Sequence, residues 1–131
     1  MKRDQRSVAL FALVLACSAP VAHASGPEGL WRTAPDRKGQ EALVHSKRCG
    51  AGNCGTIVKV FNASGTPVAA PTVGKRVFWD MTGSGSVYQG QAFVPAHNRS
   101  YDGKMQVQGN QMRVSGGLGP ICQSQTWQRV R

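Results

Sequence analysis

The chain has 131 residues, of which 16 are Lys or Arg and 6 are Asp or Glu, so its net charge is +10 at neutral pH. This length excludes a protein of several domains, because it provides one hydrophobic core of modest size. The basic residues occur singly or in pairs and never in a run of four, which argues against a polybasic tail.

Residues 1–24 have the layout of a secretory signal, with three basic residues before a short apolar run. The small-x-small site Ala22-His23-Ala24 predicts cleavage after Ala24. The apolar run is far shorter than the roughly 20 residues that cross a bilayer. We therefore expect an exported protein, periplasmic or extracellular, without a transmembrane segment. The alternative is a lipid anchor at Cys17, where the sequence loosely matches a lipoprotein attachment site.

Cleavage after Ala24 leaves a single domain, residues 25–131, with 13 basic and 5 acidic residues and a net charge of +8. Two interpretations of this charge stay open: contact with an anionic envelope component, or simply a soluble basic surface. Export argues against a nucleic-acid partner. The basic surface expected to make such contacts comprises Lys47, Arg48, Lys75, Arg76, Arg99 and Lys104.

Strand patterns follow one another through the domain, and no segment has a convincing helical period. Runs of β-branched and aromatic residues alternate with turns rich in Gly, Pro and Asn. Gly109-Asn110 stands between two alternating runs and predicts a two-residue hairpin. In chain order, the predicted strands are residues 29–33, 41–47, 56–61, 73–82, 86–94, 101–107, 111–115 and 123–131.

Eight short strands joined by tight turns predict an all-β fold, either an antiparallel meander that closes into a small barrel or a compact sandwich. Within residues 73–82, the period of two places Val73, Val77, Trp79 and Met81 on one face. An eight-stranded barrel is just filled by its own side chains or holds one small ligand.

Three cysteines remain after export. Cys49 and Cys54 flank a Gly/Asn turn, so in an oxidising compartment we expect a disulfide between them. A zinc site that adds His45 would lack a fourth ligand at a familiar spacing, and we expect no metal site. Cys122 is left over, either as a buried inert thiol or as a point of intermolecular pairing.

Few residues could carry out acid-base or nucleophilic chemistry. The domain keeps two histidines, His45 and His97, and five scattered carboxylates. It contains no nucleophile elbow, zinc-protease motif, phosphate loop or C-x-x-C. We expect no catalytic residues, no cofactor and no enzyme activity; the alternative is an enzyme that uses His97 or His45.

Several segments together resemble a known family. In order, they are Gly29-Leu30-Trp31, Cys49, Cys54-Gly55-Thr56-Ile57-Val58, Tyr101-Asp102-Gly103-Lys104-Met105 and Cys122-Gln123-Ser124-Gln125-Thr126-Trp127-Gln128-Arg129-Val130. Across nearly the whole mature chain they are similar to the exported bacterial domain of unknown function 2147 family. The resemblance implies a calycin-like, lipocalin-related barrel and an envelope or extracellular location, but no established activity. Members often carry a cysteine where this chain has Gly117, so a second disulfide to Cys122 is not expected.

The resemblance also implies a plug at one end of the barrel. In lipocalin-like barrels an Arg of the last strand covers a Trp of the first, and Trp31 and Arg129 stand in the corresponding places. A guanidinium over an indole face stabilises by about 0.5–2 kcal/mol. We expect this pair to have a structural role.

Three functions remain open. The favoured hypothesis is a monomeric, non-enzymatic binding module for a small, partly apolar ligand. A second is an interaction protein that binds an anionic polymer or blocks a partner enzyme, and the third is the enzyme considered above. The candidate pocket residues, which would otherwise simply fill the core, are Trp79, Met81, Tyr88, Phe93, Met105 and Met112.

Overall fold

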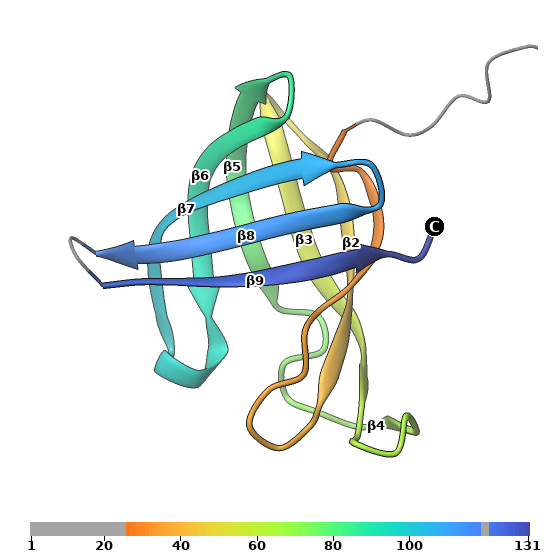
Figure 1. Cartoon of the computed structure of the whole chain (residues 1–131). Helices are drawn as coiled ribbons and strands as arrows, with labels where there is room; N and C mark the ends of the chain where they lie inside the picture. The colour runs from red at the N-terminus through yellow and green to blue at the C-terminus, as the bar shows by residue number, and fades with distance from the viewer. Residues whose placement is uncertain (1–25, 119–120) are drawn as a thin grey trace, which may run out of the picture.

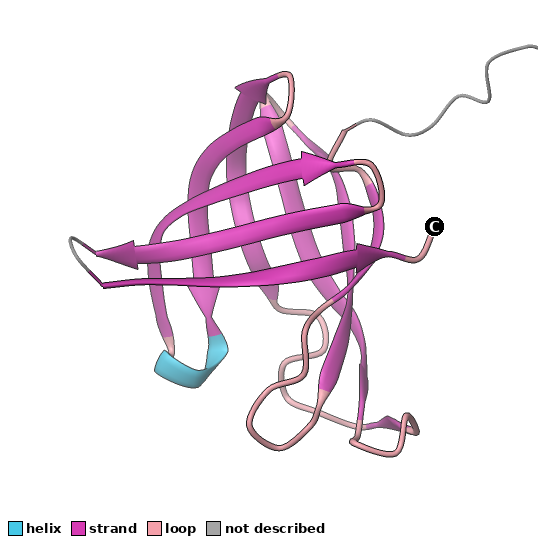
Figure 2. Ribbon diagram, viewed as in Figure 1, coloured by secondary structure: helices cyan, strands magenta, loops and turns pink. Residues whose placement is uncertain are grey.

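The computed structural model describes residues 26–118 and 121–131; the signal segment, its expected cleavage site and Cys17 lie outside the described residues. The sheet is antiparallel and closes into an eight-stranded barrel (Figures 1 and 2). In chain order the elements are β1 (Gly29–Arg32), β2 (Glu41–Cys49), β3 (Gly52–Phe61), β4 (Pro67–Val68), β5 (Arg76–Ser84), β6 (Val87–Val94), the short 3-10 helix η1 (Pro95–His97), β7 (Arg99–Gln108), β8 (Gln111–Leu118) and β9 (Ile121–Arg129).

The predicted meander is confirmed, and it forms a barrel rather than a sandwich. Strands that are consecutive in the chain pair with each other from β5 to β9, and β2 joins both β1 and β3. The two-residue β4 pairs only with the last residues of β3 and stays outside the barrel wall. The ring closes where β1 meets β9.

The two ends of the barrel differ in how they are covered. We call "closed end" the end that carries the β2–β3, β5–β6 and β7–β8 hairpins together with residues 26–29 and 130–131. The "open end" carries the longer connections 33–40 and 62–75 and η1 (Figure 1). The connections of the open end therefore decide how far the interior is accessible.

The barrel interior is apolar because alternate residues of each strand point inward. The strands contribute large, fully buried side chains, among them Trp31, Phe78 and three methionines. Among the side chains that the structure describes, the core cluster consists of Trp31, Val44, Ile57, Val60, Val77, Phe78, Met81, Met105, Val107, Met112 and Trp127.

Strand β5 departs from the period of two that the sequence predicts. Asp80 has a φ of 53°, and the register with β6 shifts between Trp79 and Thr82, which is a β-bulge. The face assignment for residues 73–82 is therefore wrong in part: Phe78 is completely buried, while Trp79 is only half-buried. Val73 precedes the strand and is exposed.

The β2–β3 hairpin is tighter than expected, because β3 begins at Gly52 and not at residue 56. Cys49 pairs across the ladder with Gly52. The predicted disulfide between Cys49 and Cys54 is confirmed, with the two Cα atoms 5.8 Å apart. The side chain of Cys122, whose state the sequence left open, lies outside what the structure describes.

Replacing both Cys49 and Cys54 by Ala should lower the free energy of unfolding by about 2 kcal/mol, since the cross-link closes a very short loop in the unfolded chain. Urea unfolding of the oxidised protein and the double variant measures this difference. Unchanged midpoints would contradict a stabilising role for the disulfide.

Candidate functional site

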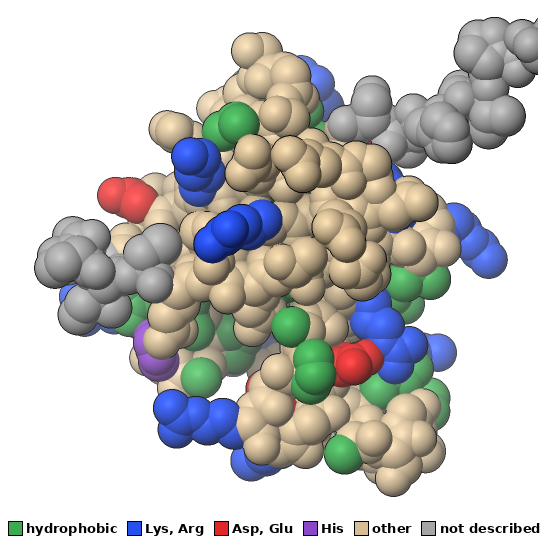
Figure 3. Space-filling view, viewed as in Figure 1, with side chains coloured by type: hydrophobic (Ala, Val, Ile, Leu, Met, Phe, Trp, Pro, Cys, Tyr) green, Lys and Arg blue, Asp and Glu red, His purple; other side chains and the backbone are tan. Residues whose placement is uncertain are grey.

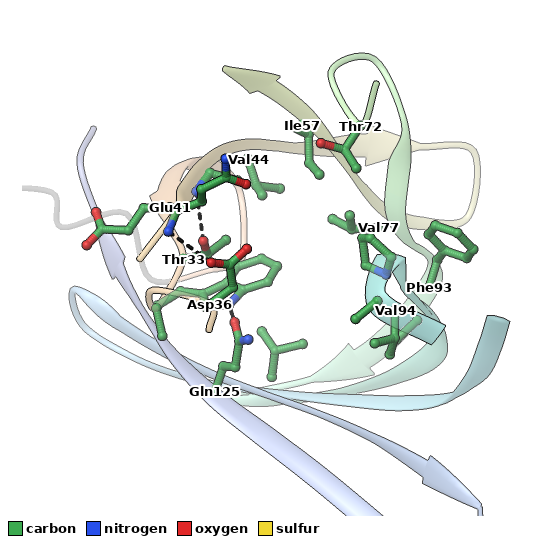
Figure 4. Close-up of a pocket in the computed structure, with 18 of the residues that line it drawn as sticks. Thr33, Asp36, Glu41, Val44, Ile57, Thr72, Val77, Phe93, Val94 and Gln125 are labelled. Atoms are coloured by element: carbon green, nitrogen blue, oxygen red, sulfur yellow. Dashed lines mark hydrogen bonds between the residues drawn. The ribbon is translucent and has the colours of Figure 1, made fainter. Parts of the chain in front are cut away.

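A cavity of about 300 Å³ lies inside the barrel towards the open end (Figure 4). Its inner wall is apolar, since inward-pointing residues of several strands meet there. Among them are Val44, Ile57, Val77, Val114 and Trp127. A pocket with an apolar interior of this size is at the small end of the range for ligand sites in proteins.

The rim of the cavity is polar. Asp36, in the β1–β2 connection, accepts backbone N–H groups of Lys38 and Gln40 on its Oδ1 at 2.8 and 2.9 Å. These bonds form an Asx-type turn that fixes the carboxylate at the rim. On β9, on the same side of the cavity as Asp36 (Figure 4), Gln125 Oε1 accepts the indole N–H of Trp127 at 3.0 Å. The rim thus offers hydrogen-bonding groups to a ligand whose body is apolar.

The other carboxylate near the rim is directed away from the cavity. Glu41 forms an ion pair with Arg32, and Figure 4 shows its side chain pointing outward. The Arg32 guanidinium also lies 4.6 Å from the centre of the Phe61 ring. Asp36 is therefore the carboxylate placed to meet a cationic or hydrogen-bond-donating group in the cavity mouth.

The predicted pair Trp31 and Arg129 is present at the closed end. The Arg129 guanidinium lies 4.2 Å from the centre of the Trp31 ring, and the indole N–H donates to Pro27 O at 2.8 Å. Arg129 also donates to Gly26 O at 2.7 Å. Burial lowers the pKa of Arg129 from its usual value. The pair holds the N-terminal segment across the barrel end.

The candidate pocket residues are distributed over different parts of the molecule. Met81, Met105 and Met112 are completely buried in the core and do not line the cavity. Trp79 and Tyr88 are half-buried and lie outside the lining, whereas Phe93 is at the rim. The structure therefore brings Phe93 to the cavity and assigns the three methionines to packing.

The lining includes residues that no sequence pattern singles out. Alternation along the strands predicts inward-facing side chains at Val44, Ile57 and Val114. It does not distinguish side chains that fill the core from side chains that line a cavity. Asp36 lies in a loop without a motif. The one available signal for Asp36 was the Pro-Asp turn sequence before Gly39, which predicts a turn but no ligand.

The predicted basic surface falls into three parts. Near the closed end are Lys47 and Arg48, and on the outer face of β7 is Lys104. At the open end are Lys75, Arg76 and Arg99. All six side chains are exposed, and the Nζ atom of Lys75 lies 5.8 Å from the centre of the Phe93 ring.

Both histidines lie outside the cavity lining. His45 is exposed on β2, and His97 Nδ1 is 3.0 Å from the Tyr101 hydroxyl on the surface. Within residues 26–118 and 121–131, no three His, Cys, Asp or Glu side chains are grouped as metal ligands would be. No helix in this part of the chain has the length and apolar character needed to cross a membrane.

Comparisons with known proteins agree with the barrel. A solved structure, protein HP1028 from the human pathogen Helicobacter pylori, is described as belonging to the lipocalin family. It superposes with a TM-score of 0.63 at 13% identity, over 79% of this chain and 82% of that one, which shows a shared fold. No curated protein matches. The model of a family described as uncharacterized proteins conserved in bacteria matches residues 29–129. The chain therefore belongs to the domain of unknown function 2147 family.

Proposed function

We propose that this protein is an exported, non-enzymatic binding module that holds a small, mostly apolar molecule in the open-end cavity. The observation that carries the proposal is the cavity itself, with its apolar wall and its polar rim at Asp36 and Gln125. The Cys49–Cys54 disulfide supports export, because such bonds persist in oxidising compartments.

The volume limits the ligand. At ~30 Å³ for each water molecule, 300 Å³ corresponds to about ten waters. A ligand of comparable size would be one aromatic system or a short alkyl chain with a single polar group. Its apolar part would contact Val77 and Val114, and its polar group would reach Asp36 or Gln125.

Val114→Phe should weaken binding of the small apolar fluorophore aminoanthracene at least tenfold, because the larger side chain would occupy the cavity that Val114 lines. Fluorescence titration of the oxidised protein measures the dissociation constant. A tenfold change corresponds to about 1.4 kcal/mol.

Val58→Phe is the matched control, since Val58 is on β3 and 43% exposed on the outer face. This variant should bind the fluorophore as the unaltered protein does. Equal affinities for Val114→Phe and the unaltered protein would contradict binding in the cavity, and so would an equal loss in both variants.

A non-denaturing mass measurement of protein recovered from its native envelope tests two further parts of the proposal, export with removal of the signal segment and the presence of a bound natural ligand. Processing after Ala24 gives a mature chain that starts at Ser25 and is two hydrogens lighter for one disulfide. Extra mass that is released on denaturation would identify the natural ligand. A bare mass at that stage would contradict stable occupancy of the cavity.

A further inference from the structure

The ring of hydrogen-bonded strands is complete at the closed end only. β1 pairs with β9 at two positions, Trp31 with Arg129 and Arg32 with Gln128. The chain then turns away, because Thr33 donates its backbone N–H to Ala42 O at 3.0 Å. In the part of the chain that the structure describes, residues 123–127 pair with β8 alone. A slit therefore separates β9 from the 33–40 connection.

The direction of the unpaired backbone groups follows from strand geometry. Arg129 donates its N–H to Asn110 O at 2.7 Å, towards β8. Successive residues of a strand direct their N–H and C=O groups to opposite sides. The backbone N–H and C=O groups of Gln125 and Trp127 are thus also directed towards β8. Those of Ser124 and Thr126 are directed into the slit.

This edge lacks the features by which proteins usually block strand addition. Such features are Lys or Pro on the edge, a bulge, or a very short strand. Residues 123–126 read Gln-Ser-Gln-Thr, without charge or Pro. They keep a regular register with β8, and all four are exposed. The edge is available to a further strand.

The cavity opens onto the same slit. Gln123, Gln125 and Trp127 line it from β9, and Thr33 and Asp36 line it from the opposite side. Figure 3 shows the hollow beneath β9 with hydrophobic side chains inside it. A strand added in the slit would direct every second side chain towards the apolar wall, because side chains alternate between the two faces.

Apart from Asp36 at the cavity mouth and Glu41, which is paired with Arg32, the charged side chains beside the slit are basic, and on the outer face they favour an acidic partner. Arg37 and Lys38 are exposed in the connection on one side of it. On the outer face of the sheet, Arg113 of β8 donates to Ser124 Oγ of β9 at 3.2 Å. Outward-facing side chains of an added strand would thus be near guanidinium groups, and carboxylates are complementary to them.

We propose that the free edge of β9 binds an extended acidic peptide segment of a partner protein as an additional strand, with its alternate apolar side chains in the cavity. The inference goes beyond the binding of a small molecule and uses the backbone of Ser124 and Thr126 in place of the rim side chains. A second copy fits less well: its own β9 already directs its inward side chains into its own cavity, so two paired copies would leave both cavities unfilled.

The probe is a fluorescent peptide, Thr-Val-Glu-Val-Glu-Val-Thr, titrated by anisotropy against the full mature protein. Thr126→Pro removes the N–H that faces the slit without removing a bond to β8, and should weaken binding at least tenfold. Thr126→Ala keeps that N–H and should bind as the unaltered protein does. Equal binding by the Pro and Ala variants would overturn the inference.

Two N-methylated forms of the peptide test backbone pairing independently of the protein variants. One carries the methyl groups on the Val residues, the other on the Glu and Thr residues. One of the two forms should lose binding and the other keep it, because only one set of N–H groups can face β9. Retention of binding by both forms would show that no strand is added and overturn the inference.

Aminoanthracene separates this inference from the proposed function. Thr126→Pro should still bind the fluorophore, which also shows that the variant is folded. Fluorophore binding without any peptide binding by the unaltered protein would overturn the strand addition alone, and peptide binding without fluorophore binding would overturn the small-molecule function alone. The unaltered protein without peptide could also have the mass of a dimer, and Thr126→Pro the mass of a monomer. That result would assign the edge of β9 to a second copy of the chain and overturn the proposal that it binds a peptide.

Discussion

Trp31→Ala should lower the free energy of unfolding by about 3–5 kcal/mol, the usual range for truncating a buried aromatic side chain. Trp31 is completely buried, donates to Pro27 O and lies under the Arg129 guanidinium. Its loss would leave a void, an unpartnered carbonyl and a cation without its ring. In a domain of this size about 1 kcal/mol corresponds to ~4–8 °C in Tm, so we expect a fall of at least ~12 °C by calorimetry.

Two control variants divide this effect into its parts. Arg129→Met keeps most of the aliphatic stem and removes the cation. It should cost about 0.5–2 kcal/mol for the lost contact with the ring, together with the hydrogen bond to Gly26 O, and should have a smaller effect than Trp31→Ala. Trp79→Ala removes the same side chain from a half-buried position and should also have a smaller effect than Trp31→Ala. If Trp79→Ala lowered the free energy of unfolding as much as Trp31→Ala, the contacts of Trp31 at the closed end would contribute no more than those of a half-buried tryptophan.

Met105→Ala should lower the free energy of unfolding by about 2–5 kcal/mol and leave aminoanthracene binding unchanged at temperatures where the variant is folded. Met105 is completely buried and pairs across the sheet with Val114 and Tyr88, but it does not line the cavity. Urea unfolding measures the first quantity and fluorescence titration the second.

Phe93→Ala should show the opposite pattern. Phe93 is half-buried at the cavity rim. Its truncation should therefore have a small effect on stability and weaken the binding of aminoanthracene several-fold. If Met105→Ala weakened binding more than Phe93→Ala, the ligand would use the half of the barrel that the three methionines fill, as the sequence predicts.

The strand positions could be predicted because a period of two and turn residues are local signals. Gly109-Asn110 marked the β7–β8 hairpin, and Gln108 indeed pairs with Gln111. The family resemblance added the closure of the barrel, which local signals leave undecided between barrel and sandwich. The bulge at Asp80 has no such signal, because it depends on the neighbouring strands: a Cβ on Gly90 would be 2.5 Å from Asp80 O, so the bulge needs a glycine opposite.

The candidate site was harder to predict than the fold. Alternation distinguishes the inside of a barrel from the outside, but it carries no information on the depth along the barrel axis. Met112 and Val114 are two residues apart on one strand and both face inward, yet Met112 fills the core and Val114 lines the cavity. That difference arises from the connections at the open end, which belong to no periodic pattern.

The Arg129 plug has a consequence for how the protein is made. Arg129 holds the carbonyl of Gly26, 103 positions earlier in the chain, so the first strand of the barrel is sealed by the last one to be synthesised. Contacts of such long sequence separation form slowly. The growing chain cannot complete its barrel before its final residues leave the ribosome. A product that stops short of β9 would expose the unpaired edges of β1 and β8, and proteases would remove it.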